Sequence, residues 1–176
     1  MLLNIPYLTI KNKLFRSKNT TLLVLDSTLY YIALHLKLSS SERATQLTEI
    51  FAYELTSSNL KNIELNTAPT SIIVYQFHNL FSQKRLNLFV TASRRSLTTT
   101  PSSLGDLFFS ATWLEREVGE MYGICFKGKK DLRNLMLQYG DSSAPFRKSY
   151  PSIGLKETLY DSVTDTLVQV PVSIQA

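Results

Sequence analysis

The chain has 176 residues, a size that favours one domain with extensions over two independent domains. With 44% hydrophobic and 19% charged residues, its composition is that of a globular protein and excludes a mainly disordered chain. The formal net charge of +5 is uneven, because residues 1–100 hold 11 Lys and Arg against 5 Asp and Glu, whereas residues 101–176 hold 8 against 9. Such an excess could favour nucleic acid, an anionic membrane or an acidic protein, and charge alone does not choose among them.

The chain is poor in metal-binding side chains. Cys125 is the single cysteine, which excludes an internal disulfide and a self-contained iron–sulfur cluster, since such a cluster needs about four thiolates. His35 and His78 are isolated from each other and do not have the spacing of a zinc site. We therefore expect no metal or other cofactor in this chain.

The chain also lacks a run of about 18 to 20 uncharged apolar residues, so no membrane-spanning helix is predicted. Its first 25 residues hold four cations and no acid before Asp26, which is weakly similar to a mitochondrial transit peptide. We interpret residues 1–19 as a basic N-terminal arm instead.

Residues 20–100 are predicted to form an α+β domain. The apolar run 20–26 indicates a strand, and Asp26 and Ser27 could cap a helix whose core-facing stripe is Leu29, Ile32, Ala33 and Leu36. Ser39 to Ser41 could cap a further short helix through Glu42 and Arg43. Strands are predicted at 47–55, 72–77 and 86–90, the last two as an antiparallel hairpin.

A charge-dense helix is expected from Trp113, with a stripe of Leu114, Val118, Met121 and Tyr122. Arg116 and Glu120 are spaced as a solvated ion pair, and Gly123 is placed to end the helix in the left-handed conformation. A second helix is predicted from Asp131, as N-cap, to Gly140, with a stripe of Leu132, Leu135, Met136 and Tyr139. Beyond it, two X-Pro pairs favour an extended arm that displays Arg147 and Lys148 outward.

These motifs, in order, are WLEREV from Trp113, a Met-Tyr-Gly-Ile turn, DLR from Asp131, Tyr139-Gly140, PFRK from Pro145, Pro151 and Gly154. Together they resemble the signature of the complex I 30-kDa subunit family, known as the C subunit in bacteria and as NADH dehydrogenase subunit 9 in mitochondria. The resemblance is dense from Trp113 to Gly154 and thinner through Pro171. The chain departs from the family pattern at Gly119, Lys129, Lys130, Ser143 and Ala144, where relatives usually carry an aromatic residue, a His-Pro pair and a Gly-His pair.

The resemblance implies an α+β fold: a mixed, largely antiparallel sheet flanked by helices, followed by an irregular C-terminal arm of short helices and extended segments over residues 101–176. It implies a non-catalytic subunit of the peripheral arm of NADH:ubiquinone oxidoreductase, on the matrix side of the mitochondrial inner membrane. Its main partner would be the 49-kDa quinone-site subunit. FMN, the iron–sulfur clusters and ubiquinone would belong to partner subunits.

The charged residues of the motifs are the candidate partner-binding residues: Glu115, Arg116, Glu117, Asp131, Arg133, Arg147 and Lys148. They could form ion pairs with a partner, or they could pair with one another and fix the two short helices. Catalysis is disfavoured, because no nucleophile, metal motif or phosphate loop accompanies the carboxylates. Two alternatives remain at this point: the equivalent subunit of a hydrogenase-type complex, and an RNA-binding organellar ribosomal protein, for which the basic first part would be the argument.

Overall fold

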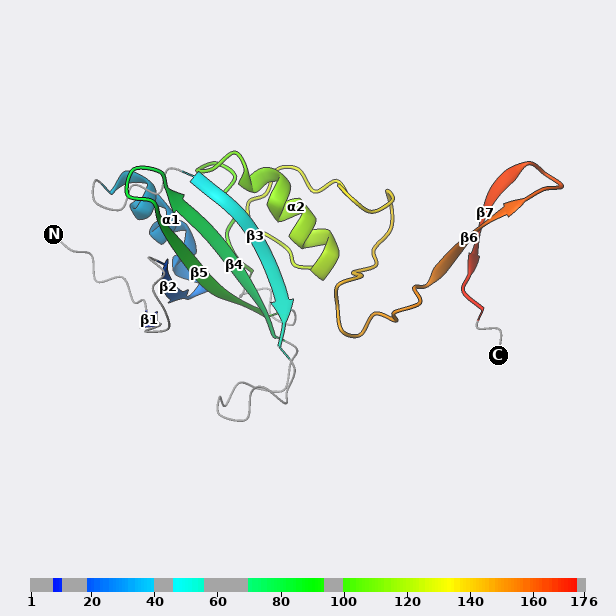
Figure 1. Cartoon of the computed structure of the whole chain (residues 1–176), viewed down its shortest axis with the longest axis horizontal. Helices are drawn as coiled ribbons and strands as arrows, with labels where there is room; N and C mark the ends of the chain where they lie inside the picture. The colour runs from blue at the N-terminus through cyan, green and yellow to red at the C-terminus, as the bar shows by residue number, and fades with distance from the viewer. Residues whose placement is uncertain (1–7, 11–18, 40–45, 56–69, 94–99, 174–176) are drawn as a thin grey trace.

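The structure is a computed structural model, and it describes residues 8–10, 19–39, 46–55, 70–93 and 100–173. Figure 1 shows a sheet covered by two helices, from which the C-terminal part of the chain leads away to a separate hairpin. The four cations of the predicted basic arm and the predicted short helix after Ser39 lie outside the described residues. No helix among the described residues is long and apolar enough to cross a membrane.

The main sheet has five strands in the order β1-β2-β5-β4-β3. Its strands are β1 (Leu8–Ile10), β2 (Asn19–Val24), β3 (Gln46–Glu54), β4 (Thr70–Asn79) and β5 (Lys84–Ser93). Only β2 and β5 run parallel, and the other neighbours are antiparallel. The predicted mixed, largely antiparallel sheet is therefore confirmed.

The hairpin of β4 and β5 is the best-fixed part of the sheet, with continuous pairing from Thr70 opposite Ser93 to Asn79 opposite Lys84. At its turn, the Asn79 side chain accepts hydrogen bonds from the amides of Phe81 and Ser82, at 2.9 and 3.1 Å. An Asn side chain that satisfies turn amides in this way closes a hairpin without needing a tight two-residue loop. The predicted hairpin is confirmed.

Both helices pack on the same face of the sheet. Helix α1 (Leu29–Leu38) follows a short 3-10 turn, η1 (Asp26–Thr28), and helix α2 spans Ala111–Tyr122. The predicted stripe of α1 is buried, and the same apolar cluster holds alternate residues of β4, namely Ile73, Tyr75 and Phe77. The predicted side-chain caps Asp26 and Ser27 do not cap α1, because the η1 turn separates them from its first residue.

The core extends past the predicted domain boundary at residue 100. Leu104, Phe108, Ala111, Val118 and Phe126 all belong to the main apolar cluster. Apolar side chains of this segment complete the cover of the sheet, so the domain proper includes α2 and the turn after it. The predicted boundary falls too early, because the polar run before Pro101 gives no sign that the chain returns to the core.

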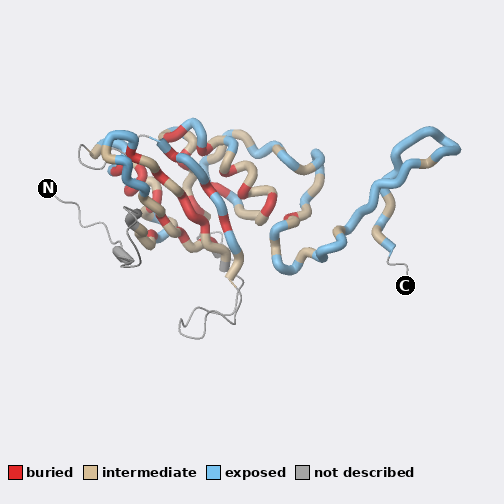
Figure 2. Tube along the Cα trace, viewed as in Figure 1, coloured by how far each residue is buried: buried red, intermediate tan, exposed pale blue. Residues whose placement is uncertain are grey.

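The chain from Gly123 onward is mostly irregular and ends in a second, two-stranded sheet. This hairpin consists of β6 (Lys156–Asp161) and β7 (Thr166–Pro171), paired antiparallel. Figure 2 shows the contrast between the domain, with its buried strands and helices, and the last part of the arm, including the hairpin, which is almost wholly exposed. The irregular, extended character of the arm agrees with prediction, whereas the hairpin itself is not predicted by the sequence analysis.

Candidate docking site around helix α2

Helix α2 ends at Tyr122, as the sequence predicts, and the residue that follows it, Gly123, is in close contact with Arg147. Gly123 adopts φ +66°, the left-handed conformation of a C-terminal cap. The guanidinium of Arg147 lies against it: Nε donates to the carbonyl of Tyr122 at 2.7 Å, and Nη2 donates to that of Gly123 at 3.2 Å. A Cβ at position 123 would stand 1.6 Å from Nη2 of Arg147, so a larger residue would displace this guanidinium as well as strain the left-handed backbone.

The expectation that the arm displays Arg147 outward is corrected, since its guanidinium binds the end of α2. The residue satisfies free carbonyls at the negative end of a helix, where a cation is electrostatically favoured. The neighbouring Lys148 anchors the arm with its backbone, since its amide donates to the Glu54 carboxylate on β3 at 2.9 Å. The pair thus ties the arm to the domain at two elements.

Glu115, one of the candidate partner-binding residues, is fully buried. Its carboxylate accepts hydrogen bonds from Ser103 Oγ at 2.6 Å and from the Leu104 amide at 2.7 Å. The Nζ of Lys129 lies 3.1 Å from the same carboxylate, and its side chain is only 6% exposed. A buried ion pair supplied with further hydrogen bonds is the arrangement that compensates the cost of removing two charges from water.

Burial and the negative charge of Glu115 both affect the pKa of Tyr75 on β4. Burial raises the pKa of the Tyr75 phenol well above its usual value, and the negative charge of Glu115 raises it further. The phenol therefore stays neutral in the core at any physiological pH.

Arg116 and Glu120 do not pair with each other; each binds the backbone of the loop that follows the helix. The Arg116 guanidinium donates to the carbonyls of Arg133 and Asn134, at 2.8 and 3.1 Å. The Glu120 carboxylate accepts the amides of Leu135 at 2.8 Å and Met136 at 2.5 Å. Two charged side chains of α2 thereby fix the same irregular loop, residues 131–139: Arg116 binds two of its carbonyls and Glu120 binds two of its amides.

The second predicted helix does not form. Residues 131–139 are irregular, and Glu120 supplies to their amides the acceptors that a helix would have supplied. Asp131 does accept an amide hydrogen bond, from Arg133 at 3.1 Å, but this closes a local turn instead of starting a helix. Gly140 has φ +85°, which is compatible with the predicted stop but ends a loop.

Asp131 and Arg133 form a side-by-side pair. Arg133 donates to both carboxylate oxygens of Asp131, at 3.0 and 2.9 Å, and Arg116 adds a longer ion pair at 3.5 Å. The side-chain hydrogen bond from Arg133, with that residue's amide, lowers the pKa of Asp131 far below its usual value. Glu117, on the same helix, has no polar partner among the described residues.

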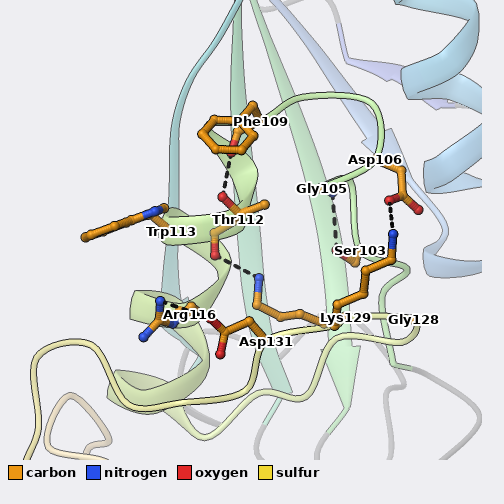
Figure 3. A pocket seen from close by; sticks show the side chains of 11 residues that line it. Ser103, Gly105, Asp106, Phe109, Thr112, Trp113, Arg116, Gly128, Lys129 and Asp131 are labelled. Atoms are coloured by element: carbon orange, nitrogen blue, oxygen red, sulfur yellow. Dashed lines mark hydrogen bonds and ion pairs between the residues drawn. The ribbon is translucent and has the colours of Figure 1, made fainter.

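A pocket of about 360 Å³ opens beside this network, between the start of α2, residues 103–109 and residues 128–131. Figure 3 shows Trp113 and Phe109 at one side of it and Asp106 at the other. The carboxylate of Asp106 pairs with the Nζ of Lys130 at 3.2 Å. Lys129 crosses the pocket to reach the Thr112 carbonyl at 2.9 Å. Sequence reasoning missed Lys129, because a lysine pair in a polar loop normally indicates a solvated surface.

Of the seven predicted site residues, the structure brings Arg116, Asp131 and Arg133 together at the loop. It buries Glu115 against Ser103 and Leu104, and it places Arg147 at the C-terminal end of α2. The pairing among motif residues accords with one of the two interpretations of their charges, in which they fix the local structure.

The fold and the site define a class of protein: a small α+β domain whose terminal helix organises a long exposed arm. The sequence profile of the respiratory-chain NADH dehydrogenase 30-kDa subunit matches residues 23–156. This chain belongs to that family. The predicted resemblance is thereby confirmed.

Individual relatives agree with this assignment. The chain is 36% identical over 102 residues to the C subunit of NADH-quinone oxidoreductase from Ruegeria pomeroyi, covering 58% of this chain and 50% of that protein. It is 33% identical over 135 residues to NADH-ubiquinone oxidoreductase subunit 9 of Paramecium primaurelia, covering 72% and 59%. The chain thus spans half to three-fifths of these relatives.

Solved structures support the fold. A trypsin-resistant fragment of Nqo5 superposes with a TM-score of 0.55 at 22% identity, over 72% of this chain and 89% of that fragment. A chain of the membrane-bound sulfane sulfur reductase, an archaeal respiratory membrane complex, superposes with a TM-score of 0.63 at 15% identity, over 84% and 78%. At such identities, the likeness speaks for the fold alone.

Proposed function

We propose that this chain is a non-catalytic core subunit of the peripheral arm of respiratory complex I, where it scaffolds the module that passes electrons from NADH to ubiquinone. Its partner is the 49-kDa quinone-site subunit, and FMN, the iron–sulfur clusters and ubiquinone belong to other subunits. The subunit lies on the matrix side of the mitochondrial inner membrane. Family membership over residues 23–156 is the starting point for this proposal.

The observation that carries the proposal is the exposed arm. The β6–β7 hairpin leaves large apolar side chains in solvent on both its faces, including Leu159, Tyr160 and Leu167. An isolated two-stranded hairpin is marginally stable in water unless another surface covers it. A contact that supplies this surface from a neighbouring chain explains why such an arm is retained.

The test is to tag the chain in the organism that carries it, solubilise membranes gently and resolve the native complexes. The proposal expects comigration with NADH-oxidising activity, together with the 49-kDa subunit. Migration with ribosomes would overturn it in favour of RNA binding, and migration with a hydrogen-evolving complex would assign the chain to the related hydrogenase-type assembly.

A further inference from the structure

The turn between β4 and β5 exposes two adjacent apolar side chains. Leu80 is 58% exposed and Phe81 is 76% exposed, and neither belongs to the apolar core cluster. The turn lies at the end of the sheet away from the C-terminal arm (Figure 1). Turns favour Gly, Pro, Asn, Asp and Ser, so a Leu-Phe pair at the tip of a hairpin is exposed apolar surface that neither the turn nor the core requires.

The shape of the tip is fixed in the free protein. Asn79, only 7% exposed, accepts hydrogen bonds at its side-chain oxygen from the amides of Phe81 and Ser82. The strand pairing continues up to the turn, with Asn79 opposite Lys84. Leu80 and Phe81 are therefore held at the outer end of the hairpin, and binding there has little backbone freedom to remove.

Cations flank this tip on both faces of the hairpin. Lys84 and Arg85 are consecutive residues of β5, so their side chains leave the sheet on opposite faces. Both are exposed, and neither forms an ion pair with a described residue. The whole segment from Thr70 to Ser93 contains no Asp or Glu, so the positive charge is not compensated within the hairpin.

This arrangement fits the surface of an anionic bilayer. A tip that enters such a surface is surrounded by it, so the acyl chains receive Leu80 and Phe81 while lipid phosphates meet the cations on both faces. A folded protein partner would need a concave pocket with acidic groups on two opposite walls. Single-stranded RNA would stack on an aromatic ring, but it offers no apolar surroundings for Leu80.

We propose that the β4–β5 turn binds anionic lipid surfaces, with Leu80 and Phe81 entering the interfacial layer and with Lys84 and Arg85 binding lipid phosphates. The contact is peripheral and reversible, since two apolar side chains and two cations amount to much less than a membrane anchor. The proposal goes beyond the proposed function and does not depend on it, because the surface belongs to this chain alone and lies away from the arm.

The experiment measures binding of the purified chain to vesicles of equimolar phosphatidylcholine and phosphatidylserine by co-sedimentation. Vesicles of pure phosphatidylcholine should bind at least roughly tenfold more weakly, because only a net negative surface attracts the cations. The double variant Lys84→Gln with Arg85→Gln should bind the mixed vesicles roughly 20–30-fold more weakly, at about fivefold per cation. Equal binding to both kinds of vesicle would overturn the proposal.

A charge-matched control separates the tip from the net charge of the chain. Lys127→Gln with Lys156→Gln removes the same two charges from exposed positions outside the β4–β5 hairpin, and this variant should bind nearly as well as the unsubstituted chain. If both double variants lose binding equally, net charge alone explains the binding and the proposed surface is refuted.

A second measurement locates the contact. In a Trp113→Phe background, Phe81→Trp places the single tryptophan at the tip, where lipids with brominated acyl chains should quench its fluorescence. Phe109→Trp in the same background is the control, since Phe109 is 84% exposed before α2 and should stay unquenched. Quenching at both positions, or at neither, would overturn the proposal.

A last variant separates lipid from RNA. Leu80→Ser with Phe81→Ser removes apolar surface and no charge, so binding to the mixed vesicles should fall at least roughly tenfold. Circular dichroism checks that each variant is folded, and the comparison of the two vesicle compositions needs no variant at all. If the serine variant binds vesicles normally, or if the unsubstituted chain binds single-stranded RNA and not vesicles, the lipid surface is refuted.

Discussion

Replacing Lys129 by methionine should destabilise the protein strongly, although the residue lies in a polar loop. The substitution keeps most of the volume of the lysine stem and removes the charge that faces Glu115 at 3.1 Å. The carboxylate cannot escape to water, because its side chain is fully buried and accepts hydrogen bonds from Ser103 and Leu104. The substitution therefore leaves a buried charge without its counter-ion.

Removing one partner of a buried ion pair costs about 3–5 kcal/mol. In a domain of this size, that loss lowers the melting temperature by roughly 6–20 °C. Urea unfolding of the purified full-length chain, followed by circular dichroism, measures the free energy directly. The double variant Lys129→Met with Glu115→Gln should regain part of the loss, since the uncompensated charge is then gone.

The adjacent lysine provides the control. Lys130 also forms an ion pair, with Asp106 at 3.2 Å, but both side chains are mostly exposed. Exposed pairs contribute about 0–1 kcal/mol, so Lys130→Met should change the stability little. If the two neighbouring substitutions had the same small effect, the reasoning from burial would be refuted.

Three further predictions concern the ends of α2 and the loop it holds. Gly140→Ala should lower the free energy of unfolding by about 1–2 kcal/mol, because the backbone at this position is left-handed. Gly123→Ala should lower it further, because the guanidinium of Arg147 must also move. Urea unfolding of both variants measures the difference, and equal losses would contradict the close contact. Glu120→Ala should speed hydrogen exchange at the amides of Leu135 and Met136 by roughly 10–100-fold, the equivalent of losing a charge-assisted hydrogen bond, whereas Glu117→Ala should leave them unchanged. Because the folded pKa of Asp131 is lowered, its contribution to stability is complete above its ordinary pKa of 3.8 and is lost as the pH falls below that value. Thermal melting between pH 7 and pH 2 should therefore show a flatter acid decline for Asp131→Asn than for the unsubstituted chain, and parallel declines would argue against this pair.

Strands β2 to β5 and both helices of the domain could be predicted, because their patterns are local. Strand β1 was not predicted, since Leu8–Ile10 lies in the segment interpreted as a basic arm. The alternation in β3 and the β-branched runs of β4 and β5 depend on residues next to one another in the chain. The termination at Gly123 was equally visible, since a glycine after an apolar stripe is the usual helix stop. The periodic spacing of apolar residues and the residue types at turns were enough for these predictions, and no contact between distant residues had to be known.

The arrangement of charges could not be predicted, because it depends on contacts between distant residues. Glu115 has the pattern of a solvated helix residue until Ser103 and Lys129 are seen beside it. The stripe from Leu132 to Tyr139 has the spacing of a helix, yet Glu120, fifteen residues before Leu135, takes the amides that such a helix would use. Side chains that reach across the fold overrode the local preference at both places.

The Glu115–Lys129 pair also limits how this sequence can change over time. Losing either member alone leaves a charge stranded in the interior, so a lineage that alters one site must alter the other soon afterwards or pass through a poorly folded intermediate. Where position 115 is acidic, position 129 should therefore keep a side chain that can supply a proton or a positive charge to the carboxylate. Lys130, the next residue, is under no such constraint from a buried charge, because its pair with Asp106 is exposed.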